Sequence, residues 1–442
     1  MASYDLSMNR RATALAVPTN DIAVRTRLSL LGEPITLFGE RQMERRDRLR
    51  TLIAKLDADG QLETLINAHE QELEETTTMA ATAKEADEFY TVGSKQLLEA
   101  RKFIAKFSIR RASNRLQRAK SMRDDTLPAL NRAATFVLDA SEIGGDRPLT
   151  GCSFSKDGNF IATCSLNGNG GIWNMPQLTK TCTLKGHTNY ATDIAFSPVT
   201  DIVATASADQ TACLWDVKGT LLTTFTGHAD RLTRIAFHPS GDYLATASFD
   251  NTWRMWDINT ATELLLQEGH SRGVYGICFH PDGSLAASCG LDSRALVWDL
   301  RTGKNVLALE EHVKPILGID FSPNGYQLAT GGEDNTCRIW DLRKKTSVYI
   351  IPAHLNLISK VKFEPQQGYY LVTGSYDMTA KIWLSRDFKL VRTLFGHEAK
   401  VTSLDISGDG QHISTVLYSY DRTVKLWRSS KVSPEEKSMD ID

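Results

Sequence analysis

Serine, histidine and aspartate recur together through the last two thirds of the chain, and these residue types could form the catalytic triad of a hydrolase. His187, Ser207 and Asp209 make up one such set, and comparable sets follow farther along. A catalytic centre is needed only once, whereas this set is repeated and each copy is followed by a tryptophan. The repetition favours a structural network of buried hydrogen bonds, so we expect no catalytic residue and no enzymatic activity.

Tryptophans set the period of these repeats. An aspartate lies six residues before six of them, and a histidine lies 28 to 30 residues before the same six. A period of about 40 to 45 residues, with Gly-His upstream and Trp-Asp at the end, is typical of four-stranded propeller blades. The seven tryptophans, separated by 41 to 44 residues, are Trp173, Trp215, Trp256, Trp298, Trp340, Trp383 and Trp427.

This pattern resembles the Asp-His-Ser/Thr-Trp tetrad of WD40 proteins over about residues 149–427. The resemblance implies a mainly β fold, a seven-bladed WD40 β-propeller, which here follows an α-helical N-terminal region. Gly290 and Gly332 replace the expected serine in two repeats, and Asn167 replaces the aspartate of the first, so we expect looser cross-linking in those blades. The serines that would supply the tetrad hydroxyl, eight residues before the tryptophan, are Ser207, Ser248, Ser375 and Ser419.

The last repeat lacks residues for a fourth strand, because the chain beyond Trp427 soon becomes acidic and rich in serine and proline. Residues 134–140 (Ala-Thr-Phe-Val-Leu-Asp-Ala) have a strand-like pattern and lie just before the first complete blade. An unpaired edge strand is costly. We therefore predict that residues 134–140 complete the last blade and close the ring.

Bulk composition excludes several classes of protein. The seven cysteines show no Cys-x-x-Cys spacing and no pairing pattern, which predicts reduced thiols in a nucleocytoplasmic protein. No metal-binding framework or cofactor motif is visible. No apolar run approaches ~18 residues, so we expect no membrane insertion, and nothing indicates a small-molecule substrate.

The formal net charge of −2 conceals a strong local segregation of charge. Residues 57–88 contain ten acidic residues and one lysine, whereas residues 100–123 contain nine basic residues and no acid. The basic block indicates a polyanionic partner. We divide the chain into a flexible N-terminus (1–16), a two-helix segment (17–56), an acidic and then basic helical linker (57–130), the propeller (131–432) and a disordered tail (433–442).

Residues 17–56 have the pattern of two short amphipathic helices around an apolar turn that contains Phe38. Helices of this length are marginal alone, so we expect the segment to dock on a protein partner through Phe38. Its basic residues are candidate RNA contacts: Arg25, Arg27, Arg41, Arg45, Arg46 and Arg48.

Two stretches of this segment resemble the splicing factor motif domain: residues 17–28 (Val-Pro-Thr-Asn-Asp-Ile-Ala-Val-Arg-Thr-Arg-Leu) and 31–40 (Leu-Gly-Glu-Pro-Ile-Thr-Leu-Phe-Gly-Glu). With a propeller at its C-terminal side, the chain resembles the pre-mRNA-processing factor 4 family. The order of the two parts makes this resemblance more specific than either part alone.

The family resemblance implies a nuclear, non-catalytic scaffold that holds U4/U6 snRNA in the tri-snRNP. It also implies pre-mRNA-processing factor 3 as a partner of the propeller, contacts with other tri-snRNP proteins and, in some lineages, a cyclophilin near the N-terminal motif. The alternative is a WD40 adaptor or signalling hub that recruits proteins without binding RNA. Such adaptors are expected to carry an F-box-like or heptad pattern, which the N-terminal segment lacks.

A long helix is predicted over residues 93–123, with no acid between residues 100 and 123 to balance its cations. Phosphates relieve such charge and release counterions, which favours RNA. Alternatively, Phe103, Ile104 and Phe107 pack on the propeller and the cations are merely solvated; the family resemblance favours RNA. The candidate contacts are Arg101, Lys102, Lys106, Arg110, Arg111, Arg115, Arg118, Lys120 and Arg123.

Aromatic and cationic residues recur where chain segments enter or leave the strands, and in WD40 folds these positions tend to face one end of the disc. Such a mixture is typical of a protein-binding surface, although single exposed apolar residues are common on any surface. Trp253 occupies a slot that holds a small residue in other repeats, which indicates local repacking. The candidate protein contacts are Tyr190, Arg231, Phe249, Arg272, Lys314, Tyr376 and Tyr420.

Overall fold

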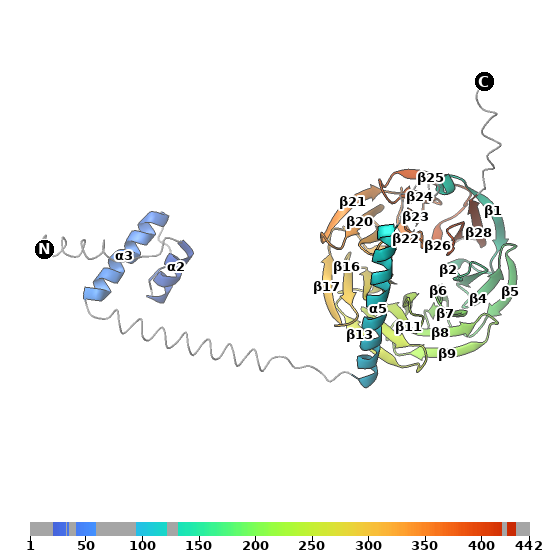
Figure 1. Cartoon of the computed structure of the whole chain (residues 1–442), viewed down its shortest axis with the longest axis horizontal. Helices are drawn as coiled ribbons and strands as arrows, with labels where there is room; N and C mark the ends of the chain where they lie inside the picture. Colours follow the sequence, from blue (N-terminus) through green and yellow to red (C-terminus); the bar gives the residue numbers. More distant parts are fainter. Residues whose placement is uncertain are drawn as a thin grey trace, which may run out of the picture. The chain divides into compact units, whose positions relative to one another are not determined.

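The computed structural model describes residues 21–31, 33–34, 41–58, 94–121, 131–417 and 422–429. The chain separates into two compact units, residues 1–92 and 93–442, and each is described by itself. The second unit contains a ring of seven four-stranded antiparallel sheets (Figure 1), which confirms the seven-bladed propeller.

Four strands build each blade, in chain order from the central channel outward. The first strands are β2 (Leu149–Phe154), β6 (Ala191–Phe196), β10 (Leu232–Phe237), β14 (Val274–Phe279), β18 (Ile316–Phe321), β22 (Ile358–Phe363) and β26 (Val401–Ile406). The second strands are β3 (Phe160–Ser165), β7 (Ile202–Ser207), β11 (Tyr243–Ser248), β15 (Leu285–Gly290), β19 (Gln327–Gly332), β23 (Tyr370–Ser375) and β27 (His412–Leu417).

The third strands carry the repeated tryptophans, and the fourth strands form the rim. The third strands are β4 (Gly170–Asn174), β8 (Thr211–Asp216), β12 (Thr252–Asp257), β16 (Ala295–Asp299), β20 (Thr336–Asp341), β24 (Ala380–Leu384) and β28 (Thr423–Ser429). The fourth strands are β5 (Thr179–Leu184), β9 (Leu221–Thr226), β13 (Glu263–Glu268), β17 (Lys304–Leu309), β21 (Thr346–Pro352) and β25 (Leu390–Leu394), with β1 (Phe136–Ile143) completing the seventh blade.

The connections between strands define two faces of the disc. Because neighbouring strands run antiparallel, the turns from first to second strand and from third to fourth strand share one face, here called the helix face. The turns from second to third strand and the connections between blades share the other, here called the tetrad face. Residues of the second strands are buried between blades, as in β11 and β23, where all six are buried.

β1 closes the ring by pairing antiparallel with β28, with Val137 opposite Arg428 and Ile143 opposite Thr423. The strand begins two residues later than the predicted segment and continues three residues beyond it. Phe136 is fully buried and its ring lies 6.2 Å from that of Tyr370, so the closing strand also contributes to the core.

The repeated His, Asp and Trp residues form hydrogen-bond chains on the tetrad face. In the second blade, His187 Nδ1 lies 2.9 Å from Asp209 Oδ2, His187 Nε2 lies 2.7 Å from Thr205 Oγ1, and Trp215 Nε1 donates to the same hydroxyl at 2.8 Å. The chain ties a loop to the second and third strands. The polar groups of His187, Asp209 and Trp215 therefore serve in a structural hydrogen-bond network, as the repetition predicted.

The predicted position of the tetrad hydroxyl was wrong by two residues. The hydroxyl belongs to Thr205, and Ser207 instead donates to the carbonyls of Asn189 and Tyr190. Residues two apart on a strand project to the same side, so spacing alone did not separate the two candidates. The equivalent hydroxyls in the later blades are Thr246, Ser288, Thr330, Thr373 and Thr415.

The blades with Gly290 and Gly332 were expected to be less rigidly cross-linked. They lack the serine that donates to the loop carbonyls in the second blade, but their tetrads are complete. Ser288 and Thr330 complete the tetrads of those blades, accepting from Trp298 and Trp340 at 2.8 Å. In the first blade, Trp173 still donates to Thr163 at 2.9 Å.

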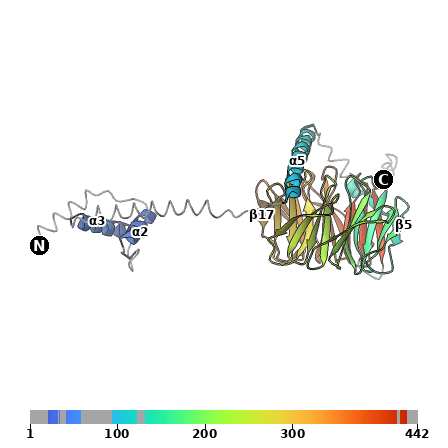
Figure 2. The same ribbon diagram turned by 90° about the horizontal axis from the view of Figure 1, so that it is seen from below.

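The first unit contains two packed helices, α2 (Asp21–Leu30) and α3 (Gln42–Ala58), where two were predicted. Val24, Leu28 and Leu49 are buried between them. The turn with Phe38 lies outside the described residues. In the second unit, α5 (Lys95–Ser121) lies on the helix face of the disc (Figure 2), although the predicted boundaries placed it in a linker.

Candidate nucleic-acid interface

α5 is held on the helix face by an apolar stripe. Ala100 and Ile104 are buried in one cluster with Tyr243, Trp253 and Leu300 of the third and fourth blades. Trp253 is fully buried beside Trp298, which agrees with the predicted local repacking. The alternative in which apolar residues of this helix pack on the propeller is thus correct for its N-terminal half.

Aromatic rings extend this contact along the helix. Phe103 lies edge-on to Tyr243 at 6.1 Å, and Phe107 lies 5.7 Å from the ring of His238. Burial lowers the pKa of His238 to about 4, and its Nε2 lies 2.9 Å from the carbonyl oxygen of Gly283. A neutral imidazole therefore supports the helix at neutral pH.

Arg115 ties the C-terminal half of α5 to the disc. Its Nη2 lies 2.6 Å from Asp282 Oδ2 and its Nε 3.0 Å from Oδ1, while Nη1 donates to the carbonyl oxygen of Asn324. The side chain of Asp282 is only 6% exposed. Arg115 was predicted to contact RNA, but its guanidinium is committed to this ion pair.

Two other predicted RNA contacts on α5 also touch the disc. Arg101 packs against the turn at Gly303, whose φ of +73° favours glycine, and a Cβ atom there would lie 2.5 Å from the Arg101 guanidinium. Arg111 lies 5.4 Å over the ring of Phe107 and 3.4 Å from the carbonyl oxygen of Pro239. Arg101 is nevertheless partly exposed and Arg111 is exposed to solvent.

The remaining predicted cations of α5 are exposed, and Arg110 and Arg118 border the space between the helix and the disc. This arrangement makes a basic ridge along a helix whose other side is fixed to the propeller. Arg123 lies outside the described residues. The predicted contacts in this ridge, all exposed, are Lys102, Lys106, Arg110, Arg118 and Lys120.

In the first unit, Asp21 organises two of the predicted arginines. Arg45, 4% exposed, contacts its Oδ1 at 2.6 Å, and Arg25 contacts its Oδ2 at 2.8 Å. Arg45 thus holds the two helices together, a role that the sequence analysis did not give it. Arg48 donates to the carbonyl oxygen of Pro34 at 2.9 Å. Arg27 and Arg41 are exposed, and Arg46 is partly exposed.

Four of the predicted protein contacts meet at the tetrad face, where they line a depression of about 580 Å³ over the central channel: Tyr190, Arg231, Phe249 and Tyr376. Arg231 lies 4.0 Å over the ring of Phe249 and donates to Tyr190 Oη at 3.1 Å. Arg272 and Lys314 are exposed outside this depression, and Tyr420 lies outside the described residues.

Arg147 and Tyr275 also line the depression and were missed. Arg147 belongs to the first repeat, which lacks the histidine that would have aligned it with the others. Tyr275 is the second residue of β14 and lies three residues after Arg272, the position that was considered in this blade. The equivalent residue in β10 is Thr233, so the tyrosine breaks the repeat and could have been noticed.

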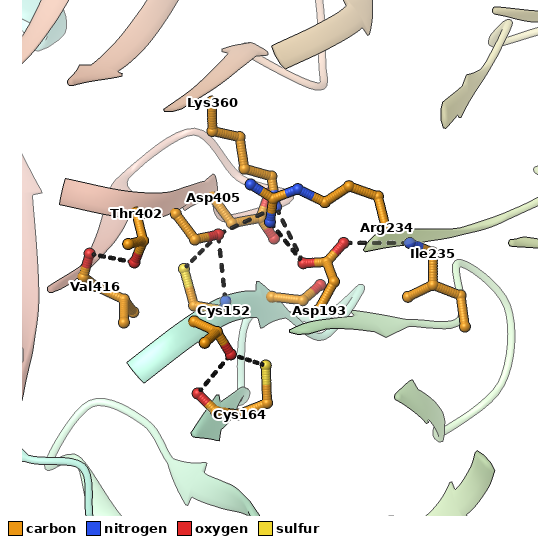
Figure 3. A network of polar contacts seen from close by, with 12 residues as sticks. Cys152, Cys164, Asp193, Arg234, Ile235, Lys360, Thr402, Asp405 and Val416 are labelled. Atoms are coloured by element: carbon orange, nitrogen blue, oxygen red, sulfur yellow. Dashed lines mark hydrogen bonds and ion pairs between the residues drawn. The ribbon is translucent and has the colours of Figure 1, made fainter. Parts of the chain in front are cut away.

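Charged side chains inside the channel form a network that sequence reasoning also missed (Figure 3). Asp193 pairs with Arg234 at 3.1 Å and lies 3.7 Å from Lys360. Its other oxygen accepts from the backbone N–H of Ile235 at 3.3 Å. Asp405 likewise accepts from the N–H of Phe154 at 2.8 Å. Each carboxylate therefore joins the first strands of adjacent blades.

Six of the seven thiols are buried, and Cys182 is partly exposed. Burial raises the pKa of Cys152 to about 11, and those of Cys164 and Cys289 to about 12. No group of three or more metal-ligating side chains occurs among the described residues. Within the same part of the chain, no helix combines the length and apolar character needed to cross a membrane.

Comparison with known proteins gives a family match for each of the two parts of the chain and a relative that matches its whole length. The family model described as WD domain, G-beta repeat matches seven successive segments between residues 140 and 428. The model described as pre-mRNA processing factor 4 (PRP4) like matches residues 24–52. A U4/U6 small nuclear ribonucleoprotein PRP4-like protein of Arabidopsis thaliana is 64% identical over 100% of this chain and 81% of its own length. The chain belongs to the pre-mRNA processing factor 4 family.

More distant members of the family align over shorter regions. The mouse U4/U6 small nuclear ribonucleoprotein Prp4 is 41% identical over 47% of this chain and 39% of its own length. The Saccharomyces cerevisiae PRP4 protein is 33% identical over 34% of this chain and 33% of its own length. The family resemblance predicted from the N-terminal motif and the tryptophan period is therefore confirmed.

Proposed function

We propose that this protein is a non-catalytic scaffold of the U4/U6 small nuclear ribonucleoprotein in pre-mRNA splicing, and that it acts in the nucleus. The similarity to proteins with that name supports the assignment. The repeated polar residues that could suggest catalysis are used in structural tetrads, which agrees with a scaffold. Its RNA partner would be the U4/U6 snRNA within the tri-snRNP.

The observation that carries this proposal is the separation of two different surfaces on one disc. The helix face holds a basic ridge fixed by Ile104 and Arg115. The tetrad face holds the aromatic and cationic depression around Arg231 and Phe249. Since the faces are opposite, RNA and a protein can bind at the same time without sharing contacts.

Cations on α5 would bind the RNA through its phosphates. Duplex RNA is recognised mainly by shape, 2′-hydroxyls and phosphates, which suits a helix rich in lysine and arginine. Arg115 and Arg45 are left out of this role because their guanidinium groups hold structural ion pairs. The proposed contacts are Lys102, Lys106, Arg110 and Lys120 of α5, with Arg27 and Arg41 of the first unit.

The depression on the tetrad face would bind the protein partner, for which the family indicates pre-mRNA-processing factor 3. Arg231 is already oriented by Phe249 and Tyr190, so little side-chain entropy would be lost on binding. A cyclophilin docking near the first unit, and other tri-snRNP proteins, remain proposals of the family resemblance.

Purification of the tagged full chain from nuclear extract tests this function. We expect U4 and U6 snRNA to copurify together with pre-mRNA-processing factor 3. Recovery of protein partners without any snRNA, from extract in which the U4/U6 particle is intact, would instead support the adaptor alternative. A control with Arg45→Met, which breaks the contact between α2 and α3, reports whether the first unit contributes.

A further inference from the structure

A groove of about 1070 Å³ lies between the C-terminal half of α5 and the helix-face turns of the fourth, fifth and sixth blades. Figure 2 shows α5 standing on that face of the disc. The groove has two chemically different walls, one from the helix and one from the propeller. The sequence did not indicate it, because the two walls are far apart along the chain.

The helix wall is cationic. Arg110, Arg111 and Arg118 line the groove. Burial lowers the pKa of Arg111, the charge of Asp282 opposes this effect, and the charge of Arg118 adds to it. Among the lining residues the one acid is Asp282, which Arg115 already neutralises. The groove therefore offers a positive field to an incoming anion.

The propeller wall is neutral and repeats from blade to blade. A proline occupies the corresponding place in each of the three turns, as Pro281, Pro323 and Pro365. Two of these turns also offer side-chain amides, including Gln366 and Gln367 of the sixth blade. Tyr326 adds an aromatic ring, and the guanidinium carbon of Arg343 lies 4.0 Å from the centre of this ring.

Single-stranded nucleic acid is bound by positively charged grooves that follow its backbone and by aromatic side chains on which its bases stack. The groove has the cations, and Phe107 and Tyr326 are among its lining residues. Pockets of about 300–1,000 Å³ bury most of a drug-sized ligand, which is similar in size to a nucleotide. The groove can therefore hold about one to three unpaired nucleotides, whereas a duplex would have to remain outside it.

We propose that this groove binds an unpaired segment of RNA that extends from the duplex held by the exposed cations of α5. The phosphates would lie against Arg111, which is not among the proposed duplex contacts, and the bases against the prolines and amides of the propeller. The inference rests on the proposed RNA-binding function, but it adds a distinct ligand form and gives the disc a direct part in RNA binding.

The test compares the affinity of the full chain for two synthetic RNAs, a blunt duplex of about 16 base pairs and the same duplex with an unpaired overhang of about six nucleotides. We expect the overhang to tighten binding by about tenfold. Gln366→Glu with Gln367→Glu places negative charge on the propeller wall at two exposed side chains. This double variant should keep the affinity for the blunt duplex and reduce the overhang gain to less than about twofold.

The matched control is Asn159→Asp with Gln411→Glu, which makes the same amide-to-acid changes at exposed positions of the helix face outside the groove. The control should retain the tenfold gain. Equal binding of both RNAs by the unchanged protein would overturn the inference while leaving the proposed function intact. Failure of the unchanged protein to bind either RNA would overturn both the inference and the proposed RNA-binding function. Displacement of the overhang by polyglutamate as readily as by oligouridine would show an acidic-peptide groove and would also overturn the inference.

Discussion

Replacement of Arg115 by methionine should release the C-terminal half of α5 from the disc. The change keeps much of the side-chain length but removes the partner of Asp282, whose side chain is 6% exposed. Removing one member of a buried ion pair costs about 3–5 kcal/mol. Arg115 itself is 26% exposed, so solvent screens the pair and we expect about 2 kcal/mol.

This free energy should appear locally, because α5 has its own contact with the disc and the blades are cross-linked by their tetrads. A loss of about 2 kcal/mol corresponds to an increase of about 30-fold in the opening equilibrium of the docked helix. Isolated helices are marginal in water, so an undocked α5 would exchange its amide protons rapidly.

Hydrogen exchange measured by mass spectrometry provides the assay. We expect peptides covering residues 95–121 to exchange about 30-fold faster in Arg115→Met, with propeller peptides unchanged. Addition of Asp282→Asn should restore part of the protection, since no uncompensated charge is then buried. Arg110→Met is the matched control, because Arg110 is exposed on the same helix. Equal exchange in the Arg115 and Arg110 variants would refute the docking role of Arg115.

Three further outcomes follow from the propeller. Burial raises the pKa of Asp334, but hydrogen bonds from His312 and Thr336 outweigh this effect and lower it to about 2. The ionised carboxylate therefore stabilises the fold above pH 4, by about 1 kcal/mol after solvent screening, and this contribution is lost as the pH falls towards 2. In Asp334→Asn, the melting temperature should therefore depend less on pH between 4 and 2. Deletion of residues 136–143 should abolish a single cooperative melting transition and expose β28 to aggregation, and an unchanged melting curve would contradict closure by β1. Alkylation of the native protein at pH 8 should reach Cys182 first, since the other six thiols are buried, and preferential labelling of any of these six would contradict the described packing.

The repeat could be predicted from sequence because each blade places the same residues at the same spacing. The tryptophan period predicted the blades, and the leftover strand-like segment before them predicted closure. The tetrad hydroxyl was misplaced because Thr205 and Ser207 share one side of β7, and only the hydrogen bond to Trp215 separates them. Periodicity identifies a side of a strand but not a hydrogen-bond partner.

The sequence predicted the docking of α5 on the propeller only as the alternative to RNA binding by this helix. Helical spacing placed Ile104 and the cations on the helix, but it did not tell which side the propeller would cover. Arg115 and Asp282 are 167 residues apart, so no local pattern links them. The channel network has the same origin, since Asp193 and Lys360 come from different blades that meet only after the ring has closed.

The division of ligands between the two faces is the central claim, and reversing three charges on each face in turn tests it most directly. Lys102→Glu, Lys106→Glu and Arg110→Glu alter the α5 ridge; Arg231→Glu, Arg272→Glu and Lys314→Glu alter the tetrad face. For the first set we predict weaker RNA binding, a salt slope lowered by about 0.7–0.9 for each lost phosphate contact, and unchanged affinity for pre-mRNA-processing factor 3. The second set should weaken only the protein complex, and loss of both ligands, or of neither, in either variant would contradict the account.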